Sequence, residues 1–369
     1  MRSLTGPTGL GSPKGGGSWF SEYDHMMDSG GDVRLKSTAA AHPNLALVKY
    51  WGKANEELRI PANNSISVNL SGARTTTSVV FSPCLDTDVV MIDGHNATGR
   101  AHDRVVRHLD RVRRMAGMSA RAMVESGNDF PASAGLASSA SAFASLSLAA
   151  SRAARLDLCE KELSMLARKG SGSACRSIPD GFVEWVAGES DSSSYARQIA
   201  PPTHWDLKFT TIILDEGPKD ISSSEGHRAT KSSPFYQARL DALPRTLEVV
   251  RQALLTKDFR SLGQAVEREA ISMHVVAMTA QLENHDWLSG IYYWQPKTLY
   301  LIQAVQEWRY QGLEIYLTID AGPNVHLLCK SKHQAELEQE LEHMLHDLGG
   351  KYFVSEPARG AWIVEEREV

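Results

Sequence analysis

The sequence predicts an α/β (α+β) protein of two lobes with a ligand cleft between them. Its 369 residues exceed the usual length of a single core, so two lobes or one large α/β unit can form. From Val33 onward, strand-like apolar runs alternate with segments whose apolar residues recur at helical spacing. Hydrophobic residues make up 42% of the chain and charged residues 22%, which is typical of a globular protein and excludes disorder of the whole.

The chain is predicted to begin with a disordered tail over residues 1–32. Its first 31 residues contain eight glycines and no apolar periodicity, a composition that does not repay the entropy cost of ordering. An N-terminal lobe over residues 33–205 and a C-terminal lobe over residues 206–369 are predicted to follow it.

Strands and helices alternate in the predicted N-terminal lobe. The helix over residues 103–117 ends at a glycine, and the helix over residues 159–170 ends at Gly170, where a left-handed C-cap is natural. The other elements are strands over 75–81, 87–94 and 121–131 and an alanine- and serine-rich helix that ends near Leu156.

The predicted C-terminal lobe has the same mixed character. Residues 237–274 contain two or more amphipathic helices. The other elements are strands over 207–217, 313–319, 325–329 and 360–365, a turn over 320–324, and helices over 297–310 and 331–348. No internal repeat is present in the sequence.

Composition excludes several classes of partner. Lys and Arg number 39 against 44 Asp and Glu, a net charge of −5 that gives no support for nucleic-acid binding. No apolar run is long enough to span a membrane, and the N-terminus lacks the apolar core of a signal peptide. The four cysteines are scattered, without spacing that would hold zinc, so we expect free thiols and a cytoplasmic protein.

The stretch "NDFPASAGLASSASAFASLSLAAS" (128–151) opens a helix almost entirely with small residues. Small side chains let a ligand approach the unpaired backbone N–H groups of the first turn, where the helix dipole favours phosphate. Ser133, Ser138 and Ser139 add hydroxyl donors. The spacing matches neither a Walker A loop nor a dinucleotide fingerprint. A close-packed helix with a Gly/Pro entry turn explains the stretch equally well.

Three further stretches place charged residues where a ligand could be held. In "NLALVKYWGK", Lys49 and Lys53 follow an apolar run, although solvated lysines at a strand end would look the same. In "GSGSACRS" (170–177), Arg176 offers a planar fork for carboxylate or phosphate, although a linker loop would also explain the stretch. In "DAGPN" (320–324), Asp320 ends a strand before a turn, where it could equally serve as an Asp cap.

Together these stretches carry a specific resemblance. "NLALVKYWGK", "NNSISVNL", "FPASAGLASSAS", "ARKGSGSACRSIPDGFVEW" and "DAGPN" resemble, in the same order, the signature segments of the mevalonate diphosphate decarboxylase family of the GHMP kinase superfamily. The resemblance covers residues 35–369. It implies the two-lobed GHMP kinase fold, with ATP and Mg²⁺ at the N-terminal lobe and a 5-phosphorylated mevalonate between the lobes.

The family's chemistry assigns expected roles to individual residues. Phosphorylation of the tertiary C3 hydroxyl would precede loss of that phosphate with CO2. Asp320 would orient or deprotonate the hydroxyl, Lys49 would neutralise charge, and Arg176 would hold the C1 carboxylate. The expected substrate contacts are Tyr50, Lys53, Arg74, Ser173, Ser222 and Ser223. The expected ATP contacts are Ser133, Gly135, Ala137, Ser138 and Ser139. No side chain is expected to form a metal site of its own.

The resemblance leaves the length of the substrate's phosphate chain open. Tyr293 and Trp294, in "GIYYWQPKTL" (290–299), look more like the phosphomevalonate decarboxylases, because bulky residues here would shorten the pocket. 5-Phosphomevalonate is therefore slightly favoured over 5-diphosphomevalonate. The sequence also allows a GHMP small-molecule kinase without decarboxylation, or a non-catalytic metabolite-binding relative. The family is commonly dimeric, which implies a homodimer.

Overall fold

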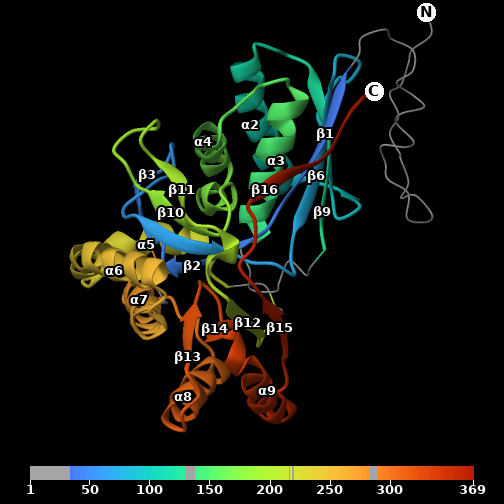
Figure 1. Ribbon diagram of the computed structural model, residues 1–369. Coiled ribbons are helices and arrows are strands. Elements are labelled where there is room, and N and C mark those ends of the chain that lie inside the picture. Colours follow the sequence, from blue (N-terminus) through green and yellow to red (C-terminus); the bar gives the residue numbers. More distant parts are fainter. Residues whose placement is uncertain (1–33, 130–137, 216, 218–219, 283–289) are drawn as a thin grey trace, which may run out of the picture.

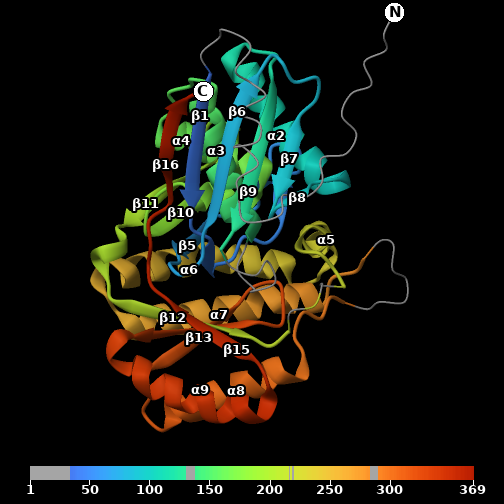
Figure 2. The ribbon, with the colours of Figure 1, turned by 90° about the vertical axis from the view of Figure 1, so that its right-hand side faces the viewer.

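The computed structural model describes residues 34–129, 138–215, 217, 220–282 and 290–369. Three sheets follow one another along the long axis of the molecule, and helices cover them (Figure 1). Figure 2 shows α6 and α7 lying crosswise between the first-sheet end of the molecule and the end that carries α8 and α9.

The first sheet has six strands in the order β16-β1-β6-β9-β7-β8, and three helices accompany it. The strands are β1 (Leu35–Ala41), β6 (Thr75–Ser82), β7 (Val89–Ile92), β8 (His95–Asn96), β9 (Arg121–Asn128) and β16 (Ala361–Glu368). The helices are α2 (Gly99–Ala116), α3 (Ser138–Ala153) and α4 (Glu160–Gly170).

Helix α3 shows why its sequence is rich in alanine and serine. The hydroxyl of Ser141 lies 2.7 Å from that of Thr75 on β6, and Ser145 lies 2.8 Å from Thr77. Small side chains let the helix approach the sheet closely, and the paired hydroxyls satisfy one another in the buried interface. The close-packed interpretation therefore holds for the middle of the helix, while its first turn faces a cavity described below.

The second sheet has the order β11-β10-β5-β2, and α6 and α7 pack against it. Its strands are β2 (Asn44–Val48), β5 (Ser65–Asn69), β10 (Phe182–Val186) and β11 (Tyr195–Ala200). The helices are α6 (Tyr236–Thr256) and α7 (Phe259–Met278). Leu45, Phe182, Leu243 and Leu262 share one buried core, which fixes β2 against the two helices.

The third sheet has the order β13-β14-β12-β15, and its core includes side chains of α8 and α9. These elements are β12 (Leu207–Ile213), β13 (Ile315–Ile319), β14 (Val325–Lys330), β15 (Lys351–Ser355), α8 (Pro296–Tyr310) and α9 (Gln334–Leu348). Shorter elements are β3 (Lys53–Asn55), β4 (Ile60–Pro61), α5 (Ser223–Ala229) and the 3₁₀ turns η1 (Gly172–Ser177), η2 (Pro202–His204), η3 (Thr230–Ser232) and η4 (Ser331–His333).

Two glycines that end predicted helices behave differently. Gly117 ends α2 with φ 64°, the left-handed cap that the sequence predicts. The same expectation for Gly170 is wrong, because the cap of α4 is Ser171 with an extended φ of −147°. A Cβ at Gly170 would lie 2.1 Å from the ring of Phe143, so this glycine permits close helix packing.

The last strand departs from the predicted C-terminal lobe. β16 pairs antiparallel with β1, so residues near the C-terminus complete the edge of the first sheet (Figure 1). A division at residue 205 thus places the whole third sheet in the second lobe, together with β16, which is a strand of the first sheet. All four cysteines are free, as expected. Among the described residues, no helix is both long and apolar enough to cross a membrane.

Candidate active site

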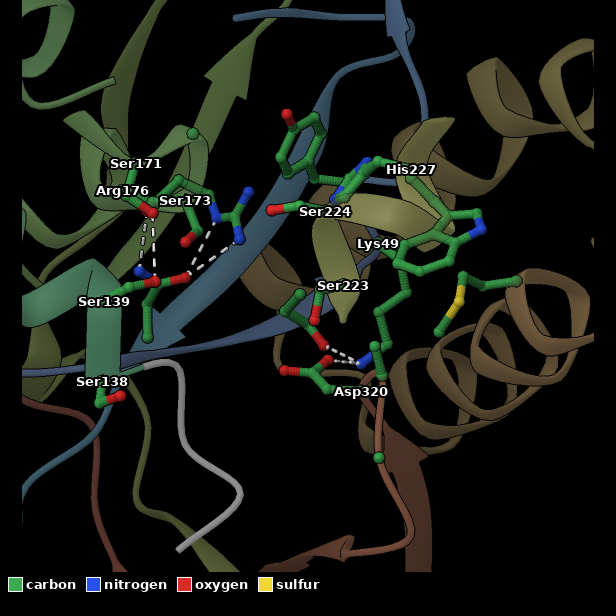
Figure 3. A pocket seen from close by; sticks show the side chains of 18 of the residues that line it. Lys49, Ser138, Ser139, Ser171, Ser173, Arg176, Ser223, Ser224, His227 and Asp320 are labelled. Carbon is green, nitrogen blue, oxygen red and sulfur yellow. Dashed lines mark hydrogen bonds and ion pairs between the residues drawn. The ribbon is translucent and has the colours of Figure 1, made fainter. Parts of the chain in front are cut away.

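A cavity of about 750 Å³ brings together side chains from segments distant in the sequence. Its described lining includes the end of β2, the first turn of α3, η1, α5 and the turn between β13 and β14. Figure 3 shows Arg176 and the serines of η1 on one wall, with Lys49 and Asp320 facing them across the opening. The cavity therefore lies between the end of β2 in the second sheet, the helices α2 and α3 that accompany the first sheet, and the turn that follows β13 in the third sheet.

Lys49 and Asp320 form the ion pair at the inner end of the cavity. The Nζ atom of Lys49 lies 2.6 Å from Oδ1 of Asp320 and donates at 2.7 Å to the carbonyl of Ala46. Burial alone would raise the pKa of Asp320, but the charge and hydrogen bond of Lys49, with the charges of His326 and Arg176, hold it below its usual range. Asp320 keeps 29% of its side chain exposed, so an ionised carboxylate is available to a ligand.

The backbone of Lys49 is held on both sides by a buried ion pair. Glu269 on α7 accepts from the N–H of Lys49 at 3.0 Å, and Arg239 on α6 donates to its carbonyl at 3.1 Å. Glu269 and Arg239 also pair with each other, and the side chain of each is 2% exposed. Asn63 donates to the same carbonyl at 3.0 Å. These contacts fix the backbone position from which the side chain of Lys49 extends into the cavity.

Arg176 is a buried cation whose orientation is set by neutral partners. Its Nε and Nη2 donate to Oδ1 of Asn44 at 3.2 and 3.1 Å, and its Nη1 donates to Ser65 at 2.7 Å. The guanidinium also lies 5.8 Å from the ring of Trp185. No carboxylate of the described residues forms a salt bridge with it, and two of its five donors remain for an anion. The predicted grip on a carboxylate stays a prediction, and these two donors are the groups that could make it.

The first turn of α3 supplies the hydroxyls that face the cavity. Ser138 and Ser139 line it, and the Oγ of Ser139 lies 3.2 Å from that of Ser171, the residue between α4 and η1 (Figure 3). Ser133, Gly135 and Ala137, predicted as ATP contacts, lie outside the described residues. The arrangement offers hydroxyl and backbone donors to phosphate oxygens at a helix N-terminus.

The cavity also suits a magnesium ion that arrives with a nucleotide. Mg²⁺ keeps several waters and takes phosphate oxygens plus only one or two protein ligands. Ser138 and Ser139 offer hydroxyl oxygens beside the cavity. No group of three or more His, Cys, Asp or Glu side chains that could hold a metal gathers among the described residues, so phosphates would supply most of the coordination.

Aromatic rings build the wall next to the charged groups. Tyr50 stacks on His227 with ring centroids 4.2 Å apart, and His227 lies 4.7 Å from the ring of Trp51. Burial, with nearby cations, lowers the pKa of His227 to about 3, and its Nδ1 accepts from the N–H of Gly52 at 2.9 Å. This histidine is therefore neutral and structural. Gly172 leaves room for Tyr50, since a Cβ there would lie 2.8 Å from its ring.

The predicted substrate contacts fall into two groups. Tyr50, Lys53, Ser173 and Ser223 line the cavity, and Lys53 also pairs with Glu56 at 2.6 Å. Two other predicted contacts, Arg74 and Ser222, do not line the cavity in the described structure.

Each of those two residues has a different partner. Arg74 is 54% exposed and pairs with Asp129 at 3.0 Å. Ser222 is the N-cap of α5, where its hydroxyl accepts from the N–H of Glu225 and donates to its carboxylate. The prediction placed both residues in the site because the family resemblance put them where the phosphate chain binds, and it did not consider their local partners.

Tyr293 and Trp294 lie behind the cavity and do not line it. Tyr293 packs edge-on against Trp51, with ring centroids 6.1 Å apart, and Trp294 lies 4.8 Å from the ring of His274. Both can therefore influence the cavity only through the side chains in front of them. The expectation of a bulky wall at these positions is corrected: Tyr293 supports the lining residue Trp51 indirectly, and Trp294 packs against His274.

Several lining residues were missed at the level of sequence. Asn44, Ser171 and Ser224 line the cavity without having been predicted. Asn44 has no local signal, because its role depends on its contact with Arg176. Ser224 could have been chosen over Ser222, since the pattern "SSSE" marks a capping box whose first serine is used by the helix. Arg59 and Arg104 also line the cavity without having been predicted.

The fold and the site define a two-lobed α/β protein that holds an anionic small molecule in a cleft of cations and hydroxyls. Residues 41–196 match the family model of the diphosphomevalonate decarboxylase-like N-terminal domain, and residues 210–362 match that of the mevalonate 5-diphosphate decarboxylase C-terminal domain.

Individual relatives extend this match across most of the chain. The phosphomevalonate decarboxylase of Haloferax volcanii is 33% identical over 83% of this chain and 91% of its own length. The human diphosphomevalonate decarboxylase is 33% identical over 83% of this chain and 80% of its own.

Solved structures agree with this assignment. The mevalonate diphosphate decarboxylase of Staphylococcus aureus superposes with a TM-score of 0.84 at 36% identity, over 90% of this chain and 99% of that one. MDDEF in complex with MVAPP, AMPPCP and magnesium gives 0.83 at 38% identity over the same shares. The chain belongs to the mevalonate diphosphate decarboxylase family, has its GHMP fold, and is an ATP-dependent decarboxylase of the mevalonate pathway.

Proposed function

We propose that the protein phosphorylates the C3 hydroxyl of 5-phosphomevalonate with ATP and then releases phosphate and CO2 to give isopentenyl phosphate. The observation that carries this proposal is the shared cavity of Lys49, Asp320 and Arg176, with Lys49 2.6 Å from Asp320. A carboxylate next to an ammonium suits a hydroxyl that must be aligned, and a separate guanidinium suits the carboxylate that will leave as CO2.

In the first step, Asp320 accepts a hydrogen bond from the C3 hydroxyl and directs its oxygen toward the γ-phosphorus of ATP. The oxygen–phosphorus bond forms as the bond to ADP breaks, and the hydroxyl proton is released. Because the pKa of Asp320 is held low, the carboxylate is a weak base, and orientation contributes more than proton abstraction. Lys49 and the hydroxyls of Ser138 and Ser139 stabilise the charge on the transferring group, which Mg²⁺ neutralises further.

In the second step, the C3–O bond breaks and phosphate leaves with its electron pair. Positive charge then develops at C3, and the adjacent carboxylate of Asp320 stabilises it. The electrons of the C1–C2 bond form the C2–C3 double bond as CO2 leaves. Arg176, oriented by Asn44 and Ser65, holds the carboxylate in the position from which this bond can break.

Two observations support the monophosphate as substrate. The chain matches the Haloferax volcanii phosphomevalonate decarboxylase over 91% of that protein. Tyr293 also supports Trp51 from behind, and Trp51 forms part of the cavity wall next to Tyr50. 5-Diphosphomevalonate, which would yield isopentenyl diphosphate, is the second candidate. It is favoured by the similarity to diphosphomevalonate decarboxylases and to a structure that holds MVAPP.

The test is to supply Mg-ATP with each mevalonate derivative separately and to measure ADP, CO2 and product mass. We expect ADP and CO2 in equal amounts and isopentenyl phosphate from the monophosphate, with a higher kcat/KM than for the diphosphate. ADP without CO2 would show a kinase that stops after the first step. A higher kcat/KM for the diphosphate would contradict the assigned chain length alone. The absence of ADP from both derivatives would contradict the proposed function.

A further inference from the structure

His274 is an imidazole buried beside the inner end of the cavity, and the proposed steps do not use it. It lies on α7, its side chain is fully buried, and the preceding residue, Met273, lines the cavity. The ring of Trp294 lies 4.8 Å from the imidazole, and the ring of Tyr293 lies 6.1 Å from it. These two aromatic rings restrict how the imidazole can turn.

Two contacts show that α7 runs along β13 toward the turn that carries the carboxylate of the ion pair. Near the start of the helix, a Cβ at Gly263 would clash with the ring of Tyr316, so the helix touches the strand there. One turn later, Glu267 accepts from the N–H of Leu317 at 3.3 Å. The helix rises about 16 Å between Gly263 and His274, and the four residues after Tyr316 span about 13 Å. His274 is therefore level with the end of β13.

The backbone at the end of β13 acts on this imidazole. Burial, with the charge of Lys49, lowers the pKa of His274 to about 3, while hydrogen bonding to the backbone of Ile319 and Asp320 opposes that fall. The ring is therefore neutral, and one of its nitrogens carries a hydrogen that it can donate. Neither ring nitrogen has another hydrogen-bond partner among the described residues. An apolar side chain would fill the same space without burying a polar donor, so packing alone does not account for an imidazole here.

We propose that His274 is a positioning residue for Asp320, whose backbone it holds through a hydrogen bond donated by its ring. The same helix already holds Lys49, because Glu269 accepts from the N–H of that lysine at 3.0 Å. α7 then fixes both partners of the ion pair, from two side chains about one and a half turns apart. The inference rests on the proposed function, in which the carboxylate of Asp320 aligns the C3 hydroxyl with ATP.

The experiment replaces the imidazole by side chains with and without a donor. His274→Leu and His274→Met remove the hydrogen bond of the ring, and using both guards against one variant that does not fold. His274→Gln and His274→Asn keep an uncharged N–H donor. kcat and KM are measured for ATP, 5-phosphomevalonate and 5-diphosphomevalonate, together with the thermal unfolding of every variant.

The matched control is His108→Leu. His108 on α2 is also fully buried, and burial, with nearby arginines, lowers its pKa to about 3. It is not part of the described cavity lining. The control therefore removes a neutral buried imidazole at a distance from Asp320, and it should lower the unfolding temperature while kcat stays within about threefold of the parent.

We expect kcat of the folded apolar variants to fall about tenfold or more, because a small displacement of Asp320 spoils the alignment of the hydroxyl. KM for ATP should change less than about threefold. At least one of the two amide variants should recover kcat to within about threefold of the parent, which restored packing alone would not achieve. Parental kcat in a folded apolar variant would overturn the proposal. So would amide variants whose kcat is as low as that of the apolar ones.

A spectroscopic measurement keeps this test independent of turnover. In protein that contains ¹⁵N-labelled aspartate, the backbone amide signal of Asp320 is identified by its loss in Asp320→Asn. The signal should shift in the apolar variants, return toward its parental position in the better amide variant, and stay in place in His108→Leu. If the parent turns over neither mevalonate derivative, the proposed function fails, while this signal still decides whether His274 positions Asp320. A signal at the parental position in every folded His274 variant would overturn the proposal even if the proposed function stands.

Discussion

At the scale of single residues, Asp320 is the group on which both proposed steps depend. Asp320→Asn keeps the shape of the side chain and removes its charge, so we expect kcat to fall at least about a thousandfold. ATP binding should stay near the parental affinity, because Ser138 and Ser139 lie across the cavity from Asp320 and keep their hydroxyls in this variant (Figure 3). Turnover is measured as ADP release, and ATP affinity by equilibrium binding. Turnover within about tenfold of the parent, equivalent to about 1.4 kcal/mol, would show that the charge of Asp320 is not required.

The charge on Lys49 should set the acid limit of activity. The pKa of Asp320 lies below 3.8, so its ionised form persists as the pH falls and is lost only below that value. We expect the parental kcat to show no loss from this group down to about pH 5. In Lys49→Met, burial is no longer opposed by the neighbouring charge, so the pKa of Asp320 rises and the acid limb of kcat moves to higher pH.

The control for this pH profile is Lys53→Met. It removes a cation from the same cavity, but Lys53 pairs with Glu56 and not with Asp320. The second ionisation of the substrate phosphate, near pH 6, is common to the parent and both variants. An acid limb that is the same in Lys49→Met and in Lys53→Met would show that Lys49 does not control the ionisation of Asp320.

Single residues also show what sequence can and cannot predict about a site. Lys49, Arg176 and Asp320 were predicted from the family resemblance, and all three line the cavity, while their catalytic roles stay predictions. Arg74 was predicted from the same resemblance but pairs with Asp129 outside the described lining, and nothing in its neighbourhood in the sequence reveals that partner. Asn44 was missed for the converse reason, because an amide on a buried strand shows no charge to notice.

At the scale of elements, α6 and α7 hold the end of β2 through Arg239 and Glu269. Glu269→Gln would leave the Arg239 guanidinium buried without its counter-charge, which costs about 3–5 kcal/mol of folding free energy. We expect that loss in chemical denaturation, together with a kcat reduced about tenfold or more. Glu267→Gln on the same helix removes a partly exposed pair with Arg309 and should cost about 1 kcal/mol or less.

A double variant separates positioning from stability in this clamp. Arg239→Met with Glu269→Leu removes both buried charges, so stability should largely return. The N–H and carbonyl of Lys49 would still lack these partners, so we expect kcat to stay low while KM for ATP changes little. A double variant with both parental stability and parental kcat would show that the clamp contributes to folding alone.

A second prediction at this scale concerns the close contact between η1 and Tyr50. The Cβ introduced by Gly172→Ala would lie 2.8 Å from the Tyr50 ring and 2.9 Å from its hydroxyl, so the ring must move. We expect KM for the phosphorylated substrate to rise about tenfold, with a smaller change in unfolding temperature. Steady-state kinetics and thermal unfolding measure the two effects. Gly127→Ala, where the nearest atom is 4.0 Å away, is the control, and equal KM values in both variants would contradict a role for Gly172 in placing Tyr50.

Elements differ in how far their sequences determine them. Periodicity predicted α2 and its glycine cap correctly, because the left-handed conformation of Gly117 ends the helix through contacts within the same segment. Gly170 carried the same signal for a different reason, the approach of Phe143 from another helix. Local pattern cannot separate the two cases, since the second depends on a residue distant in the chain.

At the scale of the whole molecule, the cavity forms because the fold brings together segments that are distant in the sequence. The sequence indicates two lobes and a cleft, because alternating strands and helices with ligand-like loops in both halves require that arrangement. It does not indicate that β16 rejoins the first sheet. β16 pairs with the side of β1 that β6 leaves open. The apolar pattern of a strand does not indicate which other strand will pair with such an edge.

Removal of residues 361–369 should therefore destabilise the first sheet although these residues lie far from it in sequence. β16 pairs with β1 from Leu35 to Ala41, and its half-buried Trp362 and Ile363 would lose their packing, about 1.5 kcal/mol each. A loss of about 3 kcal/mol corresponds to a fall of roughly 4 °C in unfolding temperature for a chain of 369 residues. Glu366→Gln, which breaks only the exposed pair with Arg152, should change that temperature far less. Because β1 runs directly into β2 and Lys49, we also expect kcat of the shortened chain to fall with its stability. A shortened chain that unfolds within about 2 °C of the parent and keeps its kcat would show that β16 is not needed to hold the first sheet or the site.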